Sequence, residues 1–271
     1  MSLNRFLARP LAAAILAMAP LAAQSVVLQP AKGETATETR TVPLAAGSVL
    51  RVRNVNGAIH VEAWDRAEVQ FTGAFKPSSE GEQVKVVLEP GSRGLEIRGE
   101  YPKHEGTGSY RGPQCQMTLK VPRQVRPTLD TVNGEISLAG TEGAASLTTV
   151  NGAVRARGLS EPLKAHTVNG AIHLEGASGA LDLGTVNGAI QGTGLDGKGG
   201  GIRAETVNGA IHLQLAGIKG RLQASTMSGR ISFQAKGAEQ VEIKKHHVRA
   251  VFPGGDQAIR LSTLNGAITL E

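Results

Sequence analysis

The sequence is poor in several residue types that mark common protein classes. It has one cysteine, one tryptophan and two tyrosines among 271 residues, and aromatic residues make up 3%. The single thiol, Cys115, excludes an internal disulfide, and its alternation with Met117 and Leu119 predicts a buried strand residue. So few aromatic side chains predict a thin core filled by aliphatic residues.

Charge of one sign is not concentrated anywhere in the chain. The sequence has 29 basic and 23 acidic side chains, a net charge of +6, and no run of five lysines or arginines. This mild excess is compatible with contact to anionic envelope polymers or to a lipid surface as a peripheral protein. Without a basic run or a recognisable binding motif, nucleic acid is not an expected partner.

The longest apolar run lies at the start of the chain. Arg5 and Arg9 precede residues 10–23, which are apolar or small and too few to span a bilayer comfortably. This pattern predicts a secretory signal peptide over residues 1–23, with an uncleaved membrane anchor as the alternative. We therefore expect an exported protein, periplasmic or at the cell surface, with a net charge of +4 once the two arginines are removed.

The dominant feature of the sequence is a repeated phrase, Thr-Val-Asn-Gly-Ala-Ile-x-Leu. Its asparagines step by 18 residues from Asn133 to Asn187, and the next steps are 21 and 20, the last ending on Ser228. A period of this size predicts a stack of similar coils. The asparagines of the phrase are Asn56, Asn133, Asn151, Asn169, Asn187, Asn208 and Asn265.

Apolar residues recur six and four positions before each asparagine and three and five positions after it. Two short strands, joined by a sharp Val-Asn-Gly bend, therefore present apolar side chains to one side. We predict an all-β protein, a β-solenoid of about 18–21-residue coils, with an antiparallel β-meander inserted near the N-terminus. A row of β-hairpins is the alternative, because Asn-Gly is a strong hairpin signal.

In a solenoid, identical asparagines would stack in register. We expect each buried amide to bond to the next, and the following glycine to adopt a left-handed backbone. The threonine two residues earlier predicts a second ladder. Its members are Thr131, Thr149, Thr167, Thr185, Thr206, Thr226 and Thr263.

The remaining regions complete the predicted organisation. Residues 24–41 lack periodicity and predict a disordered leader. Residues 42–126 hold the first copy of the phrase and the meander, whose strands show period-two alternation, and residues 127–271 form the solenoid. The last strand, residues 267–271, would leave an open edge for end-to-end self-association.

A polar column four residues after each asparagine is the candidate contact surface. It contains His60, Arg155, His173, Gln191 and His212. The coil that carries Gln191 separates His173 from His212 by about 9–10 Å, so the column does not predict a metal site. Enzyme motifs are absent, and the carboxylates of Asp182 and Glu205 fall in different columns. No cofactor is expected.

Two further segments accompany the repeat: Val-Asn-Gly-Ala-Ile-His-Val-Glu-Ala-Trp-Asp-Arg at 55–66 and Leu-Lys-Val-Pro at 119–122. With these features, residues 40–271 resemble the bacterial DUF4097 proteins, a family of β-strand repeat proteins labelled as adhesins. The resemblance implies an exported envelope protein and supplies no catalytic residues.

We therefore expect a non-enzymatic surface protein, either an adhesin-like binding module or an envelope sensor. Its partner would be an envelope ligand that is a protein, a glycan or an anionic surface. A filament-forming scaffold and a polysaccharide-acting envelope enzyme are the alternatives.

Overall fold

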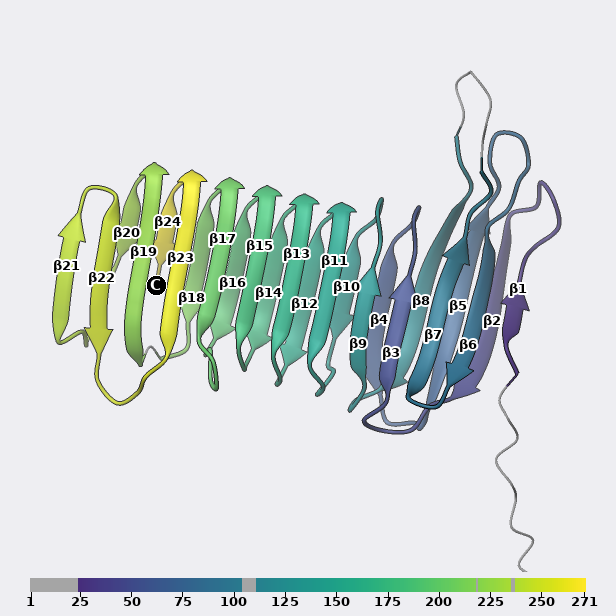
Figure 1. Cartoon of the computed structure of the whole chain (residues 1–271), viewed down its shortest axis with the longest axis horizontal. Coiled ribbons are helices and arrows are strands. Elements are labelled where there is room, and N and C mark those ends of the chain that lie inside the picture. The colour runs from purple at the N-terminus through teal and green to yellow at the C-terminus, as the bar shows by residue number, and fades with distance from the viewer. Residues whose placement is uncertain (1–23, 104–110, 218, 235–236) are drawn as a thin grey trace, which may run out of the picture.

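Two β-sheets lie face to face in an elongated stack of coils (Figure 1). The computed structural model describes residues 24–103, 111–217, 219–234 and 237–271. The predicted signal peptide, residues 1–23, lies outside these residues. The described chain is all-β and contains parallel coils, so the predicted fold class is confirmed. No helix in the described ranges is long and apolar enough to cross a membrane.

Sheet A has thirteen strands and sheet B has eleven. In spatial order, sheet A contains β1 (Val26–Leu28), β6 (Lys85–Gly91), β7 (Gly94–Glu100), β3 (Val49–Arg53), β9 (Arg126–Asp130), β11 (Ala145–Asn151), β13 (Leu163–Asn169), β15 (Leu181–Asn187), β17 (Ile202–Asn208), β23 (Ala258–Asn265), β19 (Gly220–Ser228), β22 (His247–Phe252) and β21 (Gln240–Lys244). Sheet B contains β2 (Ala36–Pro43), β5 (Glu68–Lys76), β8 (Gln114–Pro122), β4 (Ile59–Trp64), β10 (Ile136–Ala139), β12 (Val154–Leu159), β14 (Ile172–Ala177), β16 (Ile190–Leu195), β18 (Ile211–Leu215), β24 (Ile268–Leu270) and β20 (Ile231–Phe233).

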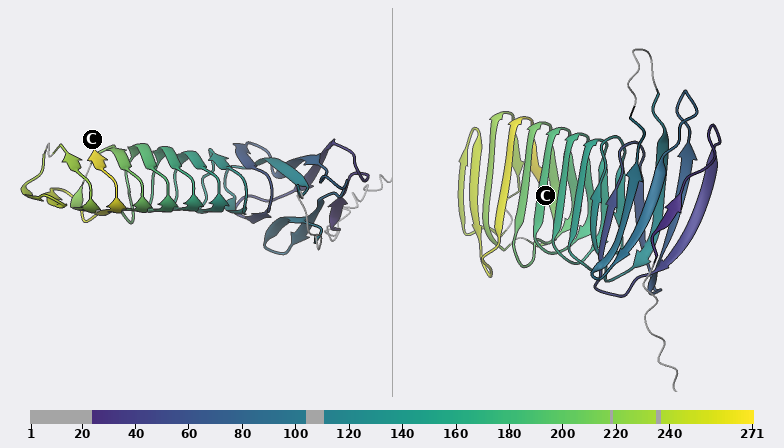
Figure 2. Two further views of the ribbon diagram at one scale, coloured as in Figure 1. Left: turned by 90° about the horizontal axis from the view of Figure 1, so that it is seen from above. Right: turned by 45° about the vertical axis from the view of Figure 1, so that its right-hand side comes forward.

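Each coil of the central stack contributes one strand to each sheet. The chain ascends in sheet A, turns at Val-Asn-Gly and descends in sheet B (Figure 1), and the two sheets are seen as two layers from above (Figure 2). Neighbouring coils pair in parallel, for example β13 with β15 and β14 with β16. This pairing excludes the row of hairpins, whose strands would be antiparallel. Period-two alternation places Ile172, Ile190 and Leu147 between the sheets, fully buried.

The last coils do not stack in sequence order. β23 and β24 lie between the coil of β17 and β18 and the coil of β19 and β20. The expected open edge at residues 267–271 is therefore wrong, because β24 has a partner on each side. The reason is that the β21–β22 hairpin pairs with one edge of β19 and leaves only the other edge for β23.

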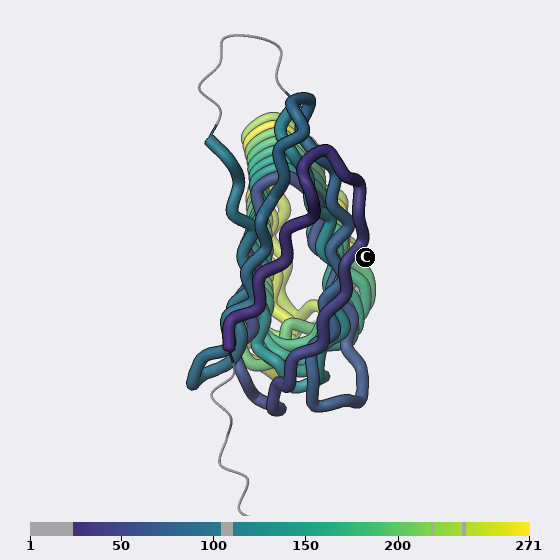
Figure 3. The backbone as a smooth tube through the Cα atoms, turned by 90° about the vertical axis from the view of Figure 1, so that its right-hand side faces the viewer, coloured from purple at the N-terminus to yellow at the C-terminus, as the bar shows by residue number. Residues whose placement is uncertain are grey.

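The N-terminal end also differs from expectation. The first copy of the phrase, β3 and β4, pairs directly with the second, β9 and β10. The inserted strands lie outside them and are divided between the layers, with β6 and β7 in sheet A and β5 and β8 in sheet B. Both sheets are therefore extended at this end, and their inner faces continue beyond the first coil. Figure 3 views the stack from this end.

Residues 24–41 contain strands and are not the disordered leader that we expected. They contain β1 and most of β2, which pairs with β5 over eight residues. Leu28 and Val42 are buried and anchor these edge strands to the core. The threonines that made the segment look polar are also favourable strand residues.

Candidate functional site

The bends form a continuous asparagine ladder along one rim of the stack. From Asn133 onward, the side-chain Nδ2 of each asparagine donates to Oδ1 of the asparagine in the coil before it in the stack, at 2.8–2.9 Å, and Asn56 is the first acceptor. All seven predicted asparagines take part, and Ser228 ends the column beside Asn265. Six of the seven are exposed and Asn56 is half-buried, so they are not buried as we expected, because they occupy the outermost position of the bend.

The glycine after each asparagine has a different role from the predicted one. Of the ladder glycines, only Gly57 has a positive φ, so the left-handed backbone is wrong for the others. A Cβ at Gly170 would instead lie 1.9 Å from the carbonyl oxygen of Gly152 in the preceding coil. Close approach of successive coils therefore requires glycine here. The left-handed glycines occur at the opposite bend, as at Gly158 and Gly176.

The predicted threonines lie in one column but do not bond to one another. Each Oγ1 donates to the carbonyl of the ladder glycine in the adjacent coil at 2.9–3.2 Å. The threonines are buried beneath the bend; Thr185, which bonds to Gly170, is 6% exposed. Neighbouring bends are thus joined twice, by threonine hydroxyls on the buried side and by asparagine amides on the solvent side.

This difference in burial leads to a prediction about stability. Thr185→Val should lower the free energy of unfolding by about 1–3 kcal/mol, because the partly buried Gly170 carbonyl loses its donor. Asn187→Ala should cost about 0.5–1 kcal/mol, because water can reach the amides it leaves unpaired. Urea unfolding of the two variants checks this order, and a larger effect of Asn187→Ala would contradict it.

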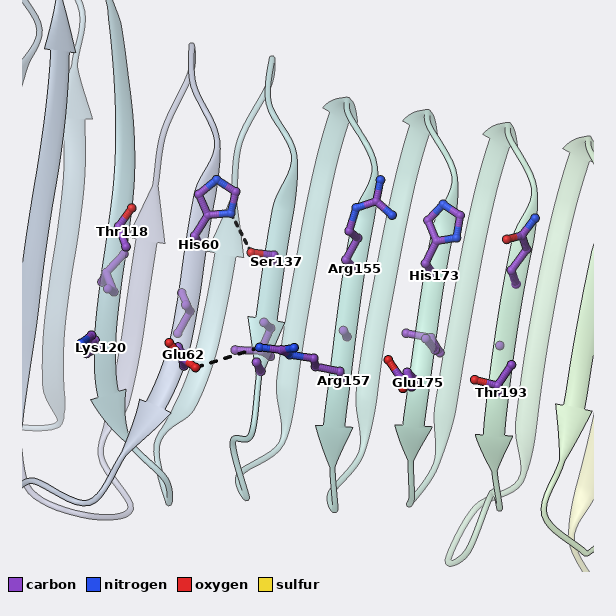
Figure 4. A pocket seen from close by; sticks show the side chains of 18 residues that line it. His60, Glu62, Thr118, Lys120, Ser137, Arg155, Arg157, His173, Glu175 and Thr193 are labelled. Carbon is purple, nitrogen blue, oxygen red and sulfur yellow. Dashed lines mark hydrogen bonds and ion pairs between the residues drawn. The ribbon is translucent and has the colours of Figure 1, made fainter.

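The predicted polar column borders a groove on the outer face of sheet B (Figure 4). The groove has a volume of about 590 Å³ and crosses β8, β4, β10, β12, β14 and β16. His60, Arg155, His173 and Gln191 line one side of it, together with Ser137. His212 continues the same row on β18, one strand beyond the groove.

Sequence reasoning missed the second side of the groove. It is a parallel row two residues further along each strand, about 7 Å away. The row contains Lys120, Glu62, Ala139, Arg157, Glu175 and Thr193. All but Lys120 stand six residues after an asparagine of the phrase, so the repeat carried a signal for this row. Ala139 is its smallest member.

Charges of both signs line this sheet B groove. Lys120, Arg155 and Arg157 face it together with Glu62 and Glu175. Nδ1 of His60 lies 2.7 Å from Oγ of Ser137, and the Arg157 guanidinium lies 4.0 Å from the Glu62 carboxylate. The surface therefore offers donors and acceptors to a polar ligand without a strong net field.

In the part of the chain that the structure describes, the side chains of the groove form no metal site and no close pair of carboxylates. Among the described residues, no group of three or more His, Cys, Asp or Glu side chains could hold a metal ion. Glu62 and Glu175 stand three strand steps apart, about 14 Å, beyond the separation of carboxyl pairs in most glycoside hydrolases.

Cys115 lies inside the N-terminal part of the core, as its alternation indicated. It is fully buried on β8, and burial raises the pKa of its thiol to about 12. The thiol is therefore protonated and inert at neutral pH.

The chain matches solved structures of bacterial proteins at low sequence identity. A proposed cell adhesion protein from Clostridium sporogenes is 12% identical, with a TM-score of 0.40, and the match covers 88% of this chain and 99% of that one. A proposed adhesin from Parabacteroides distasonis is 10% identical, with a TM-score of 0.28 and coverage of 89% and 99%. No curated protein matches the chain.

The family is shown by the sequence itself. Residues 50–271, from β3 to the last residue, match the family described as Toastrack DUF4097. The match includes the whole asparagine ladder and both sides of the sheet B groove. Because it spans most of the chain, this protein belongs to the Toastrack DUF4097 family.

Proposed function

We propose that the protein is an exported, non-enzymatic envelope protein that works as an adhesin-like binding module. The observation that carries this proposal is the sheet B groove, which crosses six strands and presents polar side chains in two rows. A row with one side chain per strand suits a ligand that repeats along its length, such as a linear envelope glycan. The signal-like residues 1–23 support export.

Binding without turnover is favoured by the spacing of the groove's charged groups. The two glutamates are too far apart to act on one glycosidic bond. Glu175 stands beside Arg157 on the adjacent strand, and the carboxylate of Glu62 lies 4.0 Å from the same guanidinium. An envelope sensor would use the same surface, with ligand occupancy as its signal.

A groove-filling variant tests the proposal. The labelled wild-type protein should bind particular polysaccharides on an array of bacterial surface glycans, without releasing fragments from them. Ala139→Trp should abolish this binding, because the new ring would occupy the groove at its smallest wall residue. Ser92→Trp, in an exposed turn elsewhere, is the matched control and should bind normally.

Unchanged binding by Ala139→Trp, or no glycan bound by the wild type, would reject the groove as the contact site. Release of sugar fragments would reject the non-enzymatic assignment.

Self-association is a second candidate, supported by the C-terminal end of the stack. The edge strand β21 exposes Val241 by 43% and Ile243 by 65%. An exposed edge with apolar side chains tends to pair with another chain. Light scattering that stays independent of protein concentration would exclude a scaffold built in this way.

A further inference from the structure

The outer face of sheet A carries a second groove, separate from the one on sheet B. Its volume is about 540 Å³. The floor is a row of small residues at or just before the starts of successive strands, from β11 to β23. These residues are Ala144, Pro162, Ala180, Gly200, Gly201 and Ala258. The row leaves a trough that runs across the strands, along the stack.

One wall of this sheet A groove is mainly basic. Lys164, Asp182, Arg203 and Arg260 stand opposite one another on β13, β15, β17 and β23. Arg203 and Arg260 are therefore adjacent, about 4.8 Å apart at their backbones. Like charges directly opposite across strands are destabilising, so this pair has no structural advantage.

Few of these cations are neutralised within the protein. Arg203 bonds to Glu205 at 3.0 Å and is also attracted by the carboxylate of Asp182, which stands between Arg203 and Lys164. Lys164 and Arg260 have no ion-pair partner in the part of the chain that the structure describes. The groove therefore presents uncompensated positive charge to solvent.

An arginine stands at each end of the small-residue floor. Arg126 on β9 lines the groove at one end, and its guanidinium donates to the Gly47 carbonyl at 3.0 and 3.2 Å. Arg221 on β19 stands beside Ala258 at the other end. Six strand steps separate the two arginines, about 29 Å, so cations bound the trough along one wall and at both ends.

We propose that the sheet A groove binds a linear anionic glycan, with its carboxylate or sulfate groups on the arginines and its sugar rings on the small-residue floor. Planar guanidinium groups bind such oxyanions in a bidentate manner. The recessed floor suits a single chain better than a flat bilayer surface. No aromatic side chain is present among the lining residues to stack nucleotide bases.

This proposal goes beyond the one for sheet B and is independent of it, because the two grooves lie on opposite faces of the stack. The probes are polygalacturonate and chondroitin sulfate, with neutral dextran as the uncharged control, measured by titration calorimetry. We expect the wild type to bind at least one anionic polymer. Raising NaCl from about 50 to about 300 mM should weaken this binding several-fold.

The arginine variant R203Q/R260Q should bind the polymer about tenfold or more weakly, because two charge-assisted contacts are lost. The control R66Q/R230Q removes the same charge from exposed positions away from the groove and should bind within about twofold of the wild type. Equal loss in both variants would overturn the proposal in favour of a general charge effect.

A second variant, Ala258→Phe, tests the trough itself. It keeps every charge and places a ring on the floor beside Arg260, at an exposed position that tolerates a larger side chain. Binding should again be lost while the circular dichroism spectrum is unchanged. Wild-type affinity in Ala258→Phe would overturn the proposal. It would also be overturned by failure of both glycans to bind, or by tighter binding of phosphatidylglycerol vesicles or oligothymidine.

Discussion

Replacing Gly170 with alanine is expected to lower the free energy of unfolding by about 3 kcal/mol or more. The new Cβ would lie 1.9 Å from the Gly152 carbonyl oxygen, which belongs to backbone and cannot rotate away. The same carbonyl accepts the Thr167 hydroxyl, so a shift of the coil would also break this partly buried hydrogen bond. Urea unfolding of the purified variant measures the loss.

Gly176→Ala is the matched control for this experiment. Gly176 has a left-handed φ of 59°, but an added Cβ there would meet nothing within 4 Å. Its cost should be about 1–2 kcal/mol, the strain of a left-handed alanine. If Gly176→Ala were the more damaging change, backbone conformation and not coil contact would be the main demand on glycine in this fold.

Deamidation of the seven Asn-Gly pairs is expected to be slow in the folded protein and about tenfold or more faster after unfolding. In this reaction the glycine backbone nitrogen attacks the asparagine side-chain carbonyl. The stack restrains both groups. The Gly170 nitrogen donates to the Asn187 carbonyl oxygen at 3.1 Å, and the Asn169 side chain is held in the ladder on both sides.

Mass spectrometry of peptides spanning Asn133 to Asn208 gives the test, after matched incubation of folded and urea-unfolded protein. A synthetic Thr-Val-Asn-Gly peptide supplies the unrestrained rate. Equal rates in the folded and unfolded states would show that the asparagines are mobile in solution, and the ladder would then not describe them.

The two candidate grooves differ in how many of their lining residues could be predicted from the sequence. One side of the sheet B groove follows from position four after the asparagine, as His60 and His173 illustrate. The other side, with Glu62 and Arg157, has an equally regular spacing, six positions after the asparagine. The sheet A groove depends on which coils are neighbours. Arg203 and Arg260 are 57 positions apart in the chain and become adjacent only because β23 inserts beside β17.

The sequence by itself determined the coil. A period of 18–21 residues, alternating apolar positions and the Val-Asn-Gly bend define two short strands and an asparagine column, because each coil contacts mainly its neighbours and local patterns suffice. Only the tertiary structure decided the order of the last coils, the division of the inserted strands between two sheets and the pairing of β1 and β2. These features depend on which free strand edge a distant segment occupies, and edges of similar composition compete for that pairing. The tertiary structure also decided why glycine follows each asparagine, because the carbonyl that leaves no room for a Cβ belongs to the neighbouring coil.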